Sequence, residues 1–326
     1  VNLPGRNPEW RQSIVDVTRV PDGRLIRWRS GRCTLVVADD NPRPWADESG
    51  RSLRVRFDDV EPDRLFYIEP HASGGLTWPT RWDADAEPAD PGPRFFPTWH
   101  WDTVRRVRAL APDVSVHGEV FSPFSQLMEL VDHAEALFCL MRQPDKVKAC
   151  LARLADGAVE LACGHFAAGA DAVLISSAFA GGGFLSPAHY REFVLPFERG
   201  VIRRVGARFP GRPIYTHTCG AIGDRLELME ETGTWGIDTL DPPPLGTVDL
   251  ADAKRRLGGR LFIKGNVDPV NTVLRGTPES CLADARSRIS IAAPGGGYVL
   301  STACSVPPHA PPETILALAE AAERWG

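Results

Sequence analysis

The chain has 326 residues, of which 43% are hydrophobic and 24% are charged, and its formal net charge is −5. This is the composition of an ordinary globular protein that can bury a sizeable core without disulfide staples. Lys and Arg are spread along the chain instead of gathered in runs, so the sequence shows no basic cluster of the kind that binds nucleic acid. No apolar stretch approaches the roughly 20 residues that span a bilayer, and the first residues lack the basic segment followed by an apolar core that is typical of a secretory signal. We therefore expect a cytoplasmic protein without a membrane partner, acting on small molecules or proteins.

The cysteines give a further indication of where the protein works. There are seven of them, an odd number with no CxxC pair, which is unlike the disulfide framework of a secreted protein. Five are interpreted as spectators in the core or at the surface: Cys33, Cys139, Cys150, Cys163 and Cys281. The other two, Cys219 and Cys304, follow predicted strands and are considered below.

Residues 1–112 are rich in Pro, Trp and Arg and are the hardest part to interpret. Two runs, 24–38 and 53–69, have extended, hairpin-like patterns. An antiparallel ribbon followed by a barrel strand would explain this part of the chain.

From about residue 113 onward, short β-branched runs alternate with longer helical patterns, which is typical of βαβ units and a parallel sheet. The predicted strands are 114–118, 172–176, 213–217, 236–240, 261–265 and 298–302. The predicted helices are 124–141, 144–168, 187–208, 221–232, 249–257, 278–292 and 311–324. A barrel needs two more strands, which must come from residues 1–112. We predict one domain over 1–326, an α/β (β/α)8 TIM barrel with an irregular, partly hairpin N-terminal extension.

Functional groups of such a barrel sit at the carboxyl ends of its strands. The strand 213–217 ends in His217, and Cys219 lies two residues on, so both side chains project to one side. Cys304 follows the last strand and would close a third corner of a tetrahedron, leaving the fourth open as in catalytic zinc sites. Two thiolates and one imidazole favour Zn²⁺ over Mg²⁺ or Mn²⁺. The alternative is chance, because a lone His-x-Cys pair is a weaker zinc signal than CxxC spacing.

Several motifs resemble the uroporphyrinogen decarboxylase superfamily over about two-thirds of the chain. They are Gly265-Asn266-Val267-Asp268-Pro269, Glu227-Leu228-Met229-Glu230-Glu231-Thr232-Gly233, Val248-Asp249-Leu250 after Leu240-Asp241, Phe121-Ser122-Pro123-Phe124, Gly169-Ala170-Asp171-Ala172, and Leu185-Ser186-Pro187 with Phe193-Val194-Leu195-Pro196-Phe197. The decarboxylases of this superfamily carry a Gly-His-Gly after the last strand and an Arg-Gln-Ala-Gly-Arg loop after the first. Neither motif is found here.

The other branch of the superfamily comprises zinc-dependent corrinoid methyltransferases of the methylcobalamin:coenzyme M type, with a His-x-Cys and a distant Cys as ligands. His217, Cys219 and Cys304 match that set. The resemblance implies a (β/α)8 barrel, a zinc-bound thiol acceptor such as coenzyme M, and methylcobalamin or another corrinoid, carried by a separate protein, as methyl donor. A decarboxylase on the same barrel and a non-catalytic thiol- or corrinoid-binding barrel stay as alternatives. The oligomeric state is left open, a homodimer being one alternative.

Other polar residues fall near the expected mouth of the barrel. His117 and Glu119 lie two residues apart at the end of the predicted strand 114–118, so their side chains share one face. Asp241 follows the predicted strand 236–240. These three are candidate catalytic residues. Asn266, Tyr190 and His309 are candidate substrate-binding residues. For Asp241 the competing explanation is turn chemistry, because Asp bonds its own backbone in tight turns. The Gly181–Gly183 run is a candidate lid.

Overall fold

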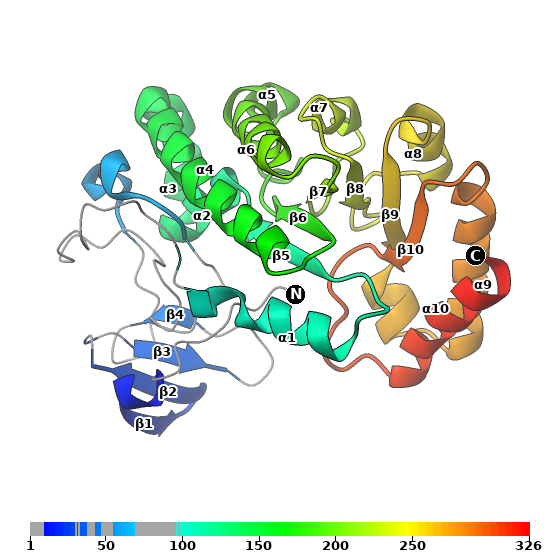
Figure 1. Cartoon of the computed structure of the whole chain (residues 1–326), viewed down its shortest axis with the longest axis horizontal. Helices are drawn as coiled ribbons and strands as arrows, with labels where there is room; N and C mark the ends of the chain where they lie inside the picture. The colour runs from blue at the N-terminus through cyan, green and yellow to red at the C-terminus, as the bar shows by residue number, and fades with distance from the viewer. Residues whose placement is uncertain are drawn as a thin grey trace. The chain divides into compact units, whose positions relative to one another are not determined.

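The computed structural model describes residues 10–29, 31, 33–37, 43–46, 55–68, 96 and 98–326 (Figure 1). The chain divides into two compact units, one formed by residues 1–173 and 203–212 and the other by residues 174–202 and 213–326. In the described part of the chain, no helix combines the length and the apolar character that crossing a membrane requires.

The first unit opens with a short 3₁₀ turn, η1 (Trp10–Ser13), and a four-stranded antiparallel sheet in the order β1-β2-β3-β4. The strands are β1 (Ile14–Val20), β2 (Gly23–Trp28), β3 (Cys33–Val36) and β4 (Arg43–Ala46), drawn in blue in Figure 1. Leu25, Cys33 and Leu35 form its buried face. The antiparallel ribbon predicted from the run 24–38 is therefore confirmed.

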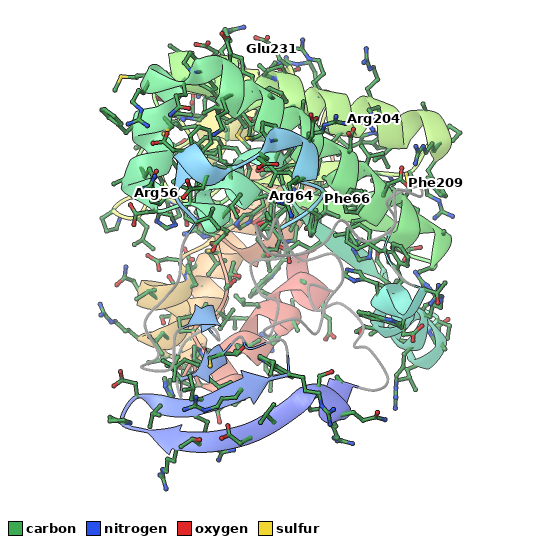
Figure 2. All side chains as sticks on the ribbon, turned by 90° about the vertical axis from the view of Figure 1, so that its left-hand side faces the viewer. Arg56, Arg64, Phe66, Arg204, Phe209 and Glu231 are labelled. Atoms are coloured by element: carbon green, nitrogen blue, oxygen red, sulfur yellow. The ribbon has the colours of Figure 1, made fainter. Side chains whose placement is uncertain are left out.

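The extended, hairpin-like structure predicted for 53–69 is wrong for the described residues 55–68. They form two 3₁₀ turns, η2 (Phe57–Asp59) and η3 (Pro62–Arg64), and one isolated bridge between Val55 and Val131. Pro62 begins η3, and four consecutive side chains from Leu65 to Ile68 are buried, so one-sided alternation is absent here. Figure 2 labels Arg56, Arg64 and Phe66 of this stretch.

The rest of the first unit is mostly helical. Its elements are η4 (Thr98–Trp101), α1 (Asp102–Leu110), β5 (His117–Phe121), α2 (Pro123–Leu130), α3 (His133–Arg142) and α4 (Pro144–Ala167). The predicted helix 124–141 is two helices, because Val131 is extended and the Asp132 side chain accepts from the backbone N–H groups of residues 134 and 135 as a new N-cap. The end of α6 (Leu195–Arg208) also belongs to this unit. Arg204, which is labelled in Figure 2, pairs with Asp156 at 2.8 Å.

A six-stranded sheet in the order β10-β9-β8-β7-β6-β5 forms the α/β part of the chain. Its other strands are β6 (Ala172–Ser176), β7 (Ile214–His217), β8 (Gly236–Thr239), β9 (Phe262–Val267) and β10 (Tyr298–Thr302), and the β7–β8, β8–β9 and β9–β10 ladders are parallel. The six predicted strands are confirmed, although β5 begins at residue 117 and not at 114. No described residue before 113 adds a strand to this sheet, so its closure into an eight-stranded barrel stays a prediction.

The helices of the second unit follow its strands. They are α5 (Pro187–Phe193), the first part of α6, α7 (Leu226–Glu230), α8 (Leu250–Leu257), the π-helical turn η5 (Pro269–Leu274), α9 (Pro278–Ala292) and α10 (Pro312–Trp325). The helix predicted over 187–208 is interrupted at Val194, and the one predicted over 221–232 is shortened to α7. α9 and α10 lie side by side (Figure 1) and bury Ala285, Ile289 and Ala321 between them.

Candidate metal centre

Three potential metal ligands meet at the carboxyl ends of two strands of the second unit. His217 is the last residue of β7, Cys219 follows it by two positions, and Cys304 lies two positions after the end of β10. His217 Nε2 lies 3.1 Å from Cys219 Sγ, and Cys219 Sγ lies 3.7 Å from Cys304 Sγ. All three side chains are half-buried, and one ligand atom from each lies within 4.8 Å of the others. The structure thus brings together the three residues that the sequence singled out.

These donors fit a zinc ion. Two ligand atoms at about 2.0–2.3 Å from a tetrahedral ion lie roughly 3.5–3.8 Å apart, close to the 3.7 Å between the two sulfurs and slightly above the 3.1 Å between nitrogen and sulfur. Imidazole and thiolate are the ligands that zinc prefers. Three protein ligands leave one position for a substrate or water, as in catalytic zinc sites. The five cysteines expected to be spectators are buried.

The electrostatics of the cluster favour positive charge between the sulfurs. Hydrogen bonds from Cys219 and His217 lower the pKa of the Cys304 thiol to about 4. The hydrogen bond to Cys304, together with burial, raises the pKa of Cys219 well above its usual range. Burial alone would lower the pKa of His217, but the interactions with Asp238 and Cys304 outweigh it and raise this pKa to about 9. The residues therefore hold a thiolate beside a proton-bearing imidazole, and a cation could replace that proton.

Asp241 fixes the turn that follows Cys219. Its Oδ2 accepts a hydrogen bond from the Gly220 N–H at 2.6 Å, and Gly220 has a φ of +78°. Gly246 packs against Asp241 so closely that a Cβ there would collide with its carbonyl oxygen. Asp241 is 4% exposed, and this burial raises the pKa of its carboxyl. Asp241 thus fixes the turn of another segment beside a candidate ligand, and this contact differs from the bonding to its own backbone that the sequence analysis gave as the alternative. Its catalytic role stays a prediction.

The amide of Asn266 is fully buried and has protein partners at both ends. Its Nδ2 donates to the Leu240 carbonyl at 2.8 Å, and its Oδ1 accepts from Arg288. Nearby, Asp268 accepts hydrogen bonds from the Val270 and Asn271 N–H groups at 2.8 Å and so caps η5. The contact of Asn266 with substrate stays a prediction.

Tyr190 leads to a buried acid that the sequence analysis missed. The Tyr190 hydroxyl is fully buried and donates to Glu198 Oε2 at 3.3 Å. Burial raises the pKa of Glu198 to about 7, against the opposite effect of hydrogen bonds from Ser177 and Tyr190. Its Oε1 has no hydrogen-bond partner among the described residues. The sequence signal that could have identified Glu198 is a charged residue on the apolar face of a helical pattern, close to Leu195.

The remaining candidates lie elsewhere in the chain. His117 and Glu119 are on β5 of the first unit, where His117 Nε2 lies 2.8 Å from Ser115 Oγ and the Glu119 carbonyl lies 3.1 Å from His165 Nε2. His309 is exposed in the segment between β10 and α10 of the second unit. Their roles in catalysis or substrate binding stay predictions.

The glycine run 181–183 is tied to the loop that carries Cys219. The Gly182 N–H donates to the Ala221 carbonyl at 2.7 Å, and a Cβ on Gly181 would collide with the Cys219 carbonyl oxygen. Glycine is therefore required at 181 by close approach of two backbones. A lid role for this run stays a prediction.

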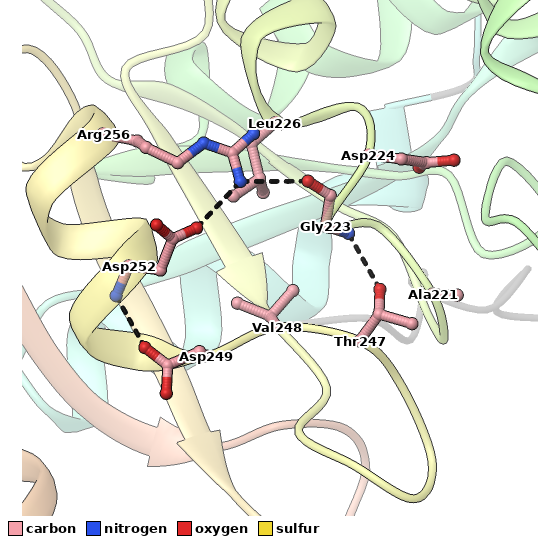
Figure 3. A pocket seen from close by; sticks show the side chains of 9 residues that line it. All are labelled: Ala221, Gly223, Asp224, Leu226, Thr247, Val248, Asp249, Asp252 and Arg256. Atoms are coloured by element: carbon pink, nitrogen blue, oxygen red, sulfur yellow. Dashed lines mark hydrogen bonds and ion pairs between the residues drawn. The ribbon is translucent and has the colours of Figure 1, made fainter.

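A cavity of about 470 Å³ lies beyond the same loop (Figure 3). Its lining residues are Ala221, Gly223, Asp224, Leu226, Thr247, Val248, Asp249, Asp252 and Arg256. Arg256 donates to the Gly223 carbonyl at 3.0 Å and pairs with Asp252 at 3.1 Å, as Figure 3 shows. It also pairs with Glu227, so its charge is already balanced by protein groups.

Comparison with known proteins places the chain in a family. The family model described as "Uroporphyrinogen decarboxylase (URO-D)" matches residues 82–325. A uroporphyrinogen decarboxylase of Thioalkalivibrio sulfidiphilus is 32% identical over 57% of this chain and 51% of its own length. One of Legionella pneumophila (strain Lens) is 26% identical over 68% of this chain and 62% of its own. The chain thus spans about half to two-thirds of the length of these curated relatives.

A solved structure has the same fold. It is described as a methyltransferase from Methanosarcina mazei and superposes with a TM-score of 0.60, at 23% sequence identity, over 68% of this chain and 62% of that one. This likeness concerns the fold alone. With the family model matching well over half of its residues, the chain belongs to the uroporphyrinogen decarboxylase (URO-D) family.

Proposed function

We propose that this protein is a zinc-dependent methyltransferase that moves a methyl group from a methyl-corrinoid, or another methyl donor, to a thiol. The observation that carries the proposal is the convergence of His217, Cys219 and Cys304. Members of the URO-D family are enzymes, which supports turnover over mere binding. The proposal includes a single domain in which the six observed parallel strands are completed to a (β/α)8 barrel.

The chemistry follows from the ligand set. A free thiol has a pKa of about 8.5 and is mostly protonated at neutral pH, whereas zinc, when bound, would hold an acceptor thiol as its thiolate. Cys219 and Cys304, as thiolates, balance the charge of a divalent ion. An acceptor thiolate therefore adds a net negative charge and keeps nucleophilic character at its sulfur. The sulfur–methyl bond would form as the cobalt–carbon bond of a methyl-corrinoid breaks, the electron pair of that bond would stay on the cobalt of the departing corrinoid, and the thiol proton would be released to solvent.

A second candidate function is decarboxylation on the same fold, favoured by the names of the curated relatives. Two features of the sequence disfavour it. The end of β10 and the two residues after it read Thr302-Ala303-Cys304 where the decarboxylases carry Gly-His-Gly, and the Arg-Gln-Ala-Gly-Arg loop does not occur in the sequence. A third candidate is a barrel that binds a thiol or a corrinoid without turnover.

The experiment that separates these functions joins metal analysis to a turnover assay. The purified protein is incubated with methylcobalamin and a panel of thiols that includes coenzyme M, and loss of the cobalt–methyl absorbance and formation of the methyl thioether are followed. We expect about one zinc per chain and methylation of at least one thiol. Full zinc with no thioether from any thiol would favour the non-catalytic barrel over the methyltransferase.

The same assay tests the ligand set. Replacing His217, Cys219 or Cys304 with Ala should lower zinc content and methyl transfer together while circular dichroism shows a folded protein. Cys281→Ala is the matched control, because Cys281 is a fully buried free thiol on α9 of the same unit whose Sγ donates to the Thr272 carbonyl. Full zinc in all three ligand variants would show that the proposed set is wrong.

A further inference from the structure

We propose that Thr239 is the positioning residue that holds the His217 ring with Nε2 toward the metal, and that Asp238 and Lys264 hold Thr239 in place. This inference rests on the proposed function, because it assumes that His217 binds zinc. It concerns residues that the sequence analysis did not select.

The strand register brings Thr239 next to the candidate ligand. The parallel ladder of β7 and β8 pairs His217 with Asp238, so Thr239 lies one residue further toward the carboxyl end. Thr239 Oγ1 is 2.5 Å from His217 Nδ1, while His217 Nε2 faces Cys219 Sγ at 3.1 Å. With Nε2 bound to the metal, Nδ1 would carry the remaining ring proton and donate it to the threonine hydroxyl oxygen. The hydroxyl thus sets both the orientation and the tautomer of the ring.

A regular strand could not make this contact. Consecutive residues of a strand point to opposite faces, yet the side chains of both Asp238 and Thr239 approach the same ring nitrogen, at 3.9 and 2.5 Å. The backbone accounts for this, because Thr239 has a φ of +90° and Leu240 has a φ of +53°. Such angles are costly for residues with a Cβ, and most costly for a β-branched one. The strain turns the Thr239 hydroxyl toward His217.

Two neighbours keep this backbone in place. Asp238 accepts a hydrogen bond from the Thr239 N–H at 2.8 Å through Oδ1, and one from Lys264 Nζ at 2.7 Å through Oδ2. Lys264 is opposite Asp238 in the β8–β9 ladder. The next residue of β9, Gly265, leaves room for the turned backbone, since a Cβ there would lie 2.5 Å from the Thr239 carbonyl oxygen. The strained turn is therefore fixed from two sides.

The His217 ring contacts the Thr239 hydroxyl and not the nearby Asp238 carboxylate. Asp238 Oδ2 is 3.9 Å from His217 Nδ1, which is too long for a hydrogen bond. Its side chain is only 6% exposed, and Lys264 balances its charge. The imidazole side of the site thus adds no net charge to the two thiolates. Partners that orient a metal-bound histidine change metal affinity by about 10–100-fold when removed.

The test is zinc affinity, measured by equilibrium competition with a chromophoric chelator. Thr239→Val keeps the β-branched shape but loses the acceptor, and we expect its zinc dissociation constant to rise by about 10–100-fold. Thr239→Ser keeps the hydroxyl and should retain wild-type affinity. Thr314→Val is the control for losing a buried threonine hydrogen bond, because Thr314 is 1% exposed and donates to the Val273 carbonyl at 2.8 Å. It should bind zinc as the wild type does.

The outcomes separate this inference from the proposed function. Tight zinc binding by wild type and Thr239→Val alike would overturn the role of Thr239 and leave the zinc site standing. A wild type that binds no zinc at all would overturn both. Should Thr239→Val fail to fold, ¹⁵N NMR of the zinc-loaded wild type decides: a protonated Nδ1 and a metal-bound Nε2 on His217 are expected, and zinc on Nδ1 would contradict the inference.

Discussion

Glu198 is a buried acid whose replacement should stabilise the protein at neutral and alkaline pH. Its side chain is 1% exposed, and burial raises its pKa from 4.5 to about 7. Glu198→Gln keeps the shape and a hydrogen-bond acceptor for Tyr190 but removes the ionisation. The wild type must either bury a charge or hold a proton that the unfolded chain has already lost.

The magnitude follows from the two pKa values. Below pH 4.5 the carboxyl is protonated in both the folded and the unfolded chain, and it does not affect the pH dependence. Between pH 4.5 and 7 the unfolded chain loses the proton first, so the folded state loses stability as pH rises. At about 1.4 kcal/mol per pH unit, a shift of roughly 2.5 units amounts to about 3 kcal/mol above pH 7.

The assay is urea unfolding of wild type and Glu198→Gln at pH 4 and pH 8. The difference in unfolding free energy between the two proteins should change by about 3 kcal/mol in favour of the variant at the higher pH. Groups that titrate in both proteins cancel from this difference. Glu192→Gln serves as the control for the same substitution at an exposed site, because Glu192 is exposed on the neighbouring helix. A flat difference for Glu198→Gln would refute the reasoning.

Three further predictions concern the metal, the substrate and acid stability. X-ray absorption at the zinc edge should show the sulfur count rise from two to three when an acceptor thiol saturates the site, with release of about one proton; an unchanged count in an active sample would contradict thiol activation. Uroporphyrinogen should not be converted to coproporphyrinogen, because the decarboxylase motifs are missing, and chromatographic detection of that product would overturn the assignment. Burial lowers the pKa of His165 to about 3, so the unfolded chain takes up this proton first and stability is lost as pH falls below 6.5. His165→Gln should lessen that loss by about 3 kcal/mol at pH 4.5, as measured by urea unfolding, and an equal loss in both proteins would speak against it.

Most of the parallel sheet could be predicted because its strands are short β-branched runs between capped helices. β5 was placed three residues early, since Val114 and Val116 continue the β-branched pattern while the observed strand begins with His117-Gly118-Glu119. The break between α2 and α3 was missed because apolar periodicity continues across it. Only the extended backbone at Val131 and the cap at Asp132 mark it.

The meeting of His217, Cys219 and Cys304 could be anticipated from two regularities, the two-residue period of a strand and the common edge of parallel strand ends. The surroundings of the ring could not. Thr239 should point away from His217 by strand alternation, and only its positive φ reverses this. The pairing of Glu198 with Tyr190 depends on how two helices meet across the break at Val194, which no local pattern encodes.

The two candidate sulfur ligands are 85 positions apart in the sequence, so a bound ion would tie together distant points of one polypeptide. A covalent link closing a loop of this length removes conformational freedom from the unfolded chain worth about 4–5 kcal/mol. A bound metal ion would act as a reversible cross-link, which would form when the ion binds and break when the ion dissociates. Among the described strands, β10 has β9 as its only neighbour. A chelator that removes such an ion is therefore expected to loosen β10 and α10 first, which would link the protein's lifetime to the supply of the metal.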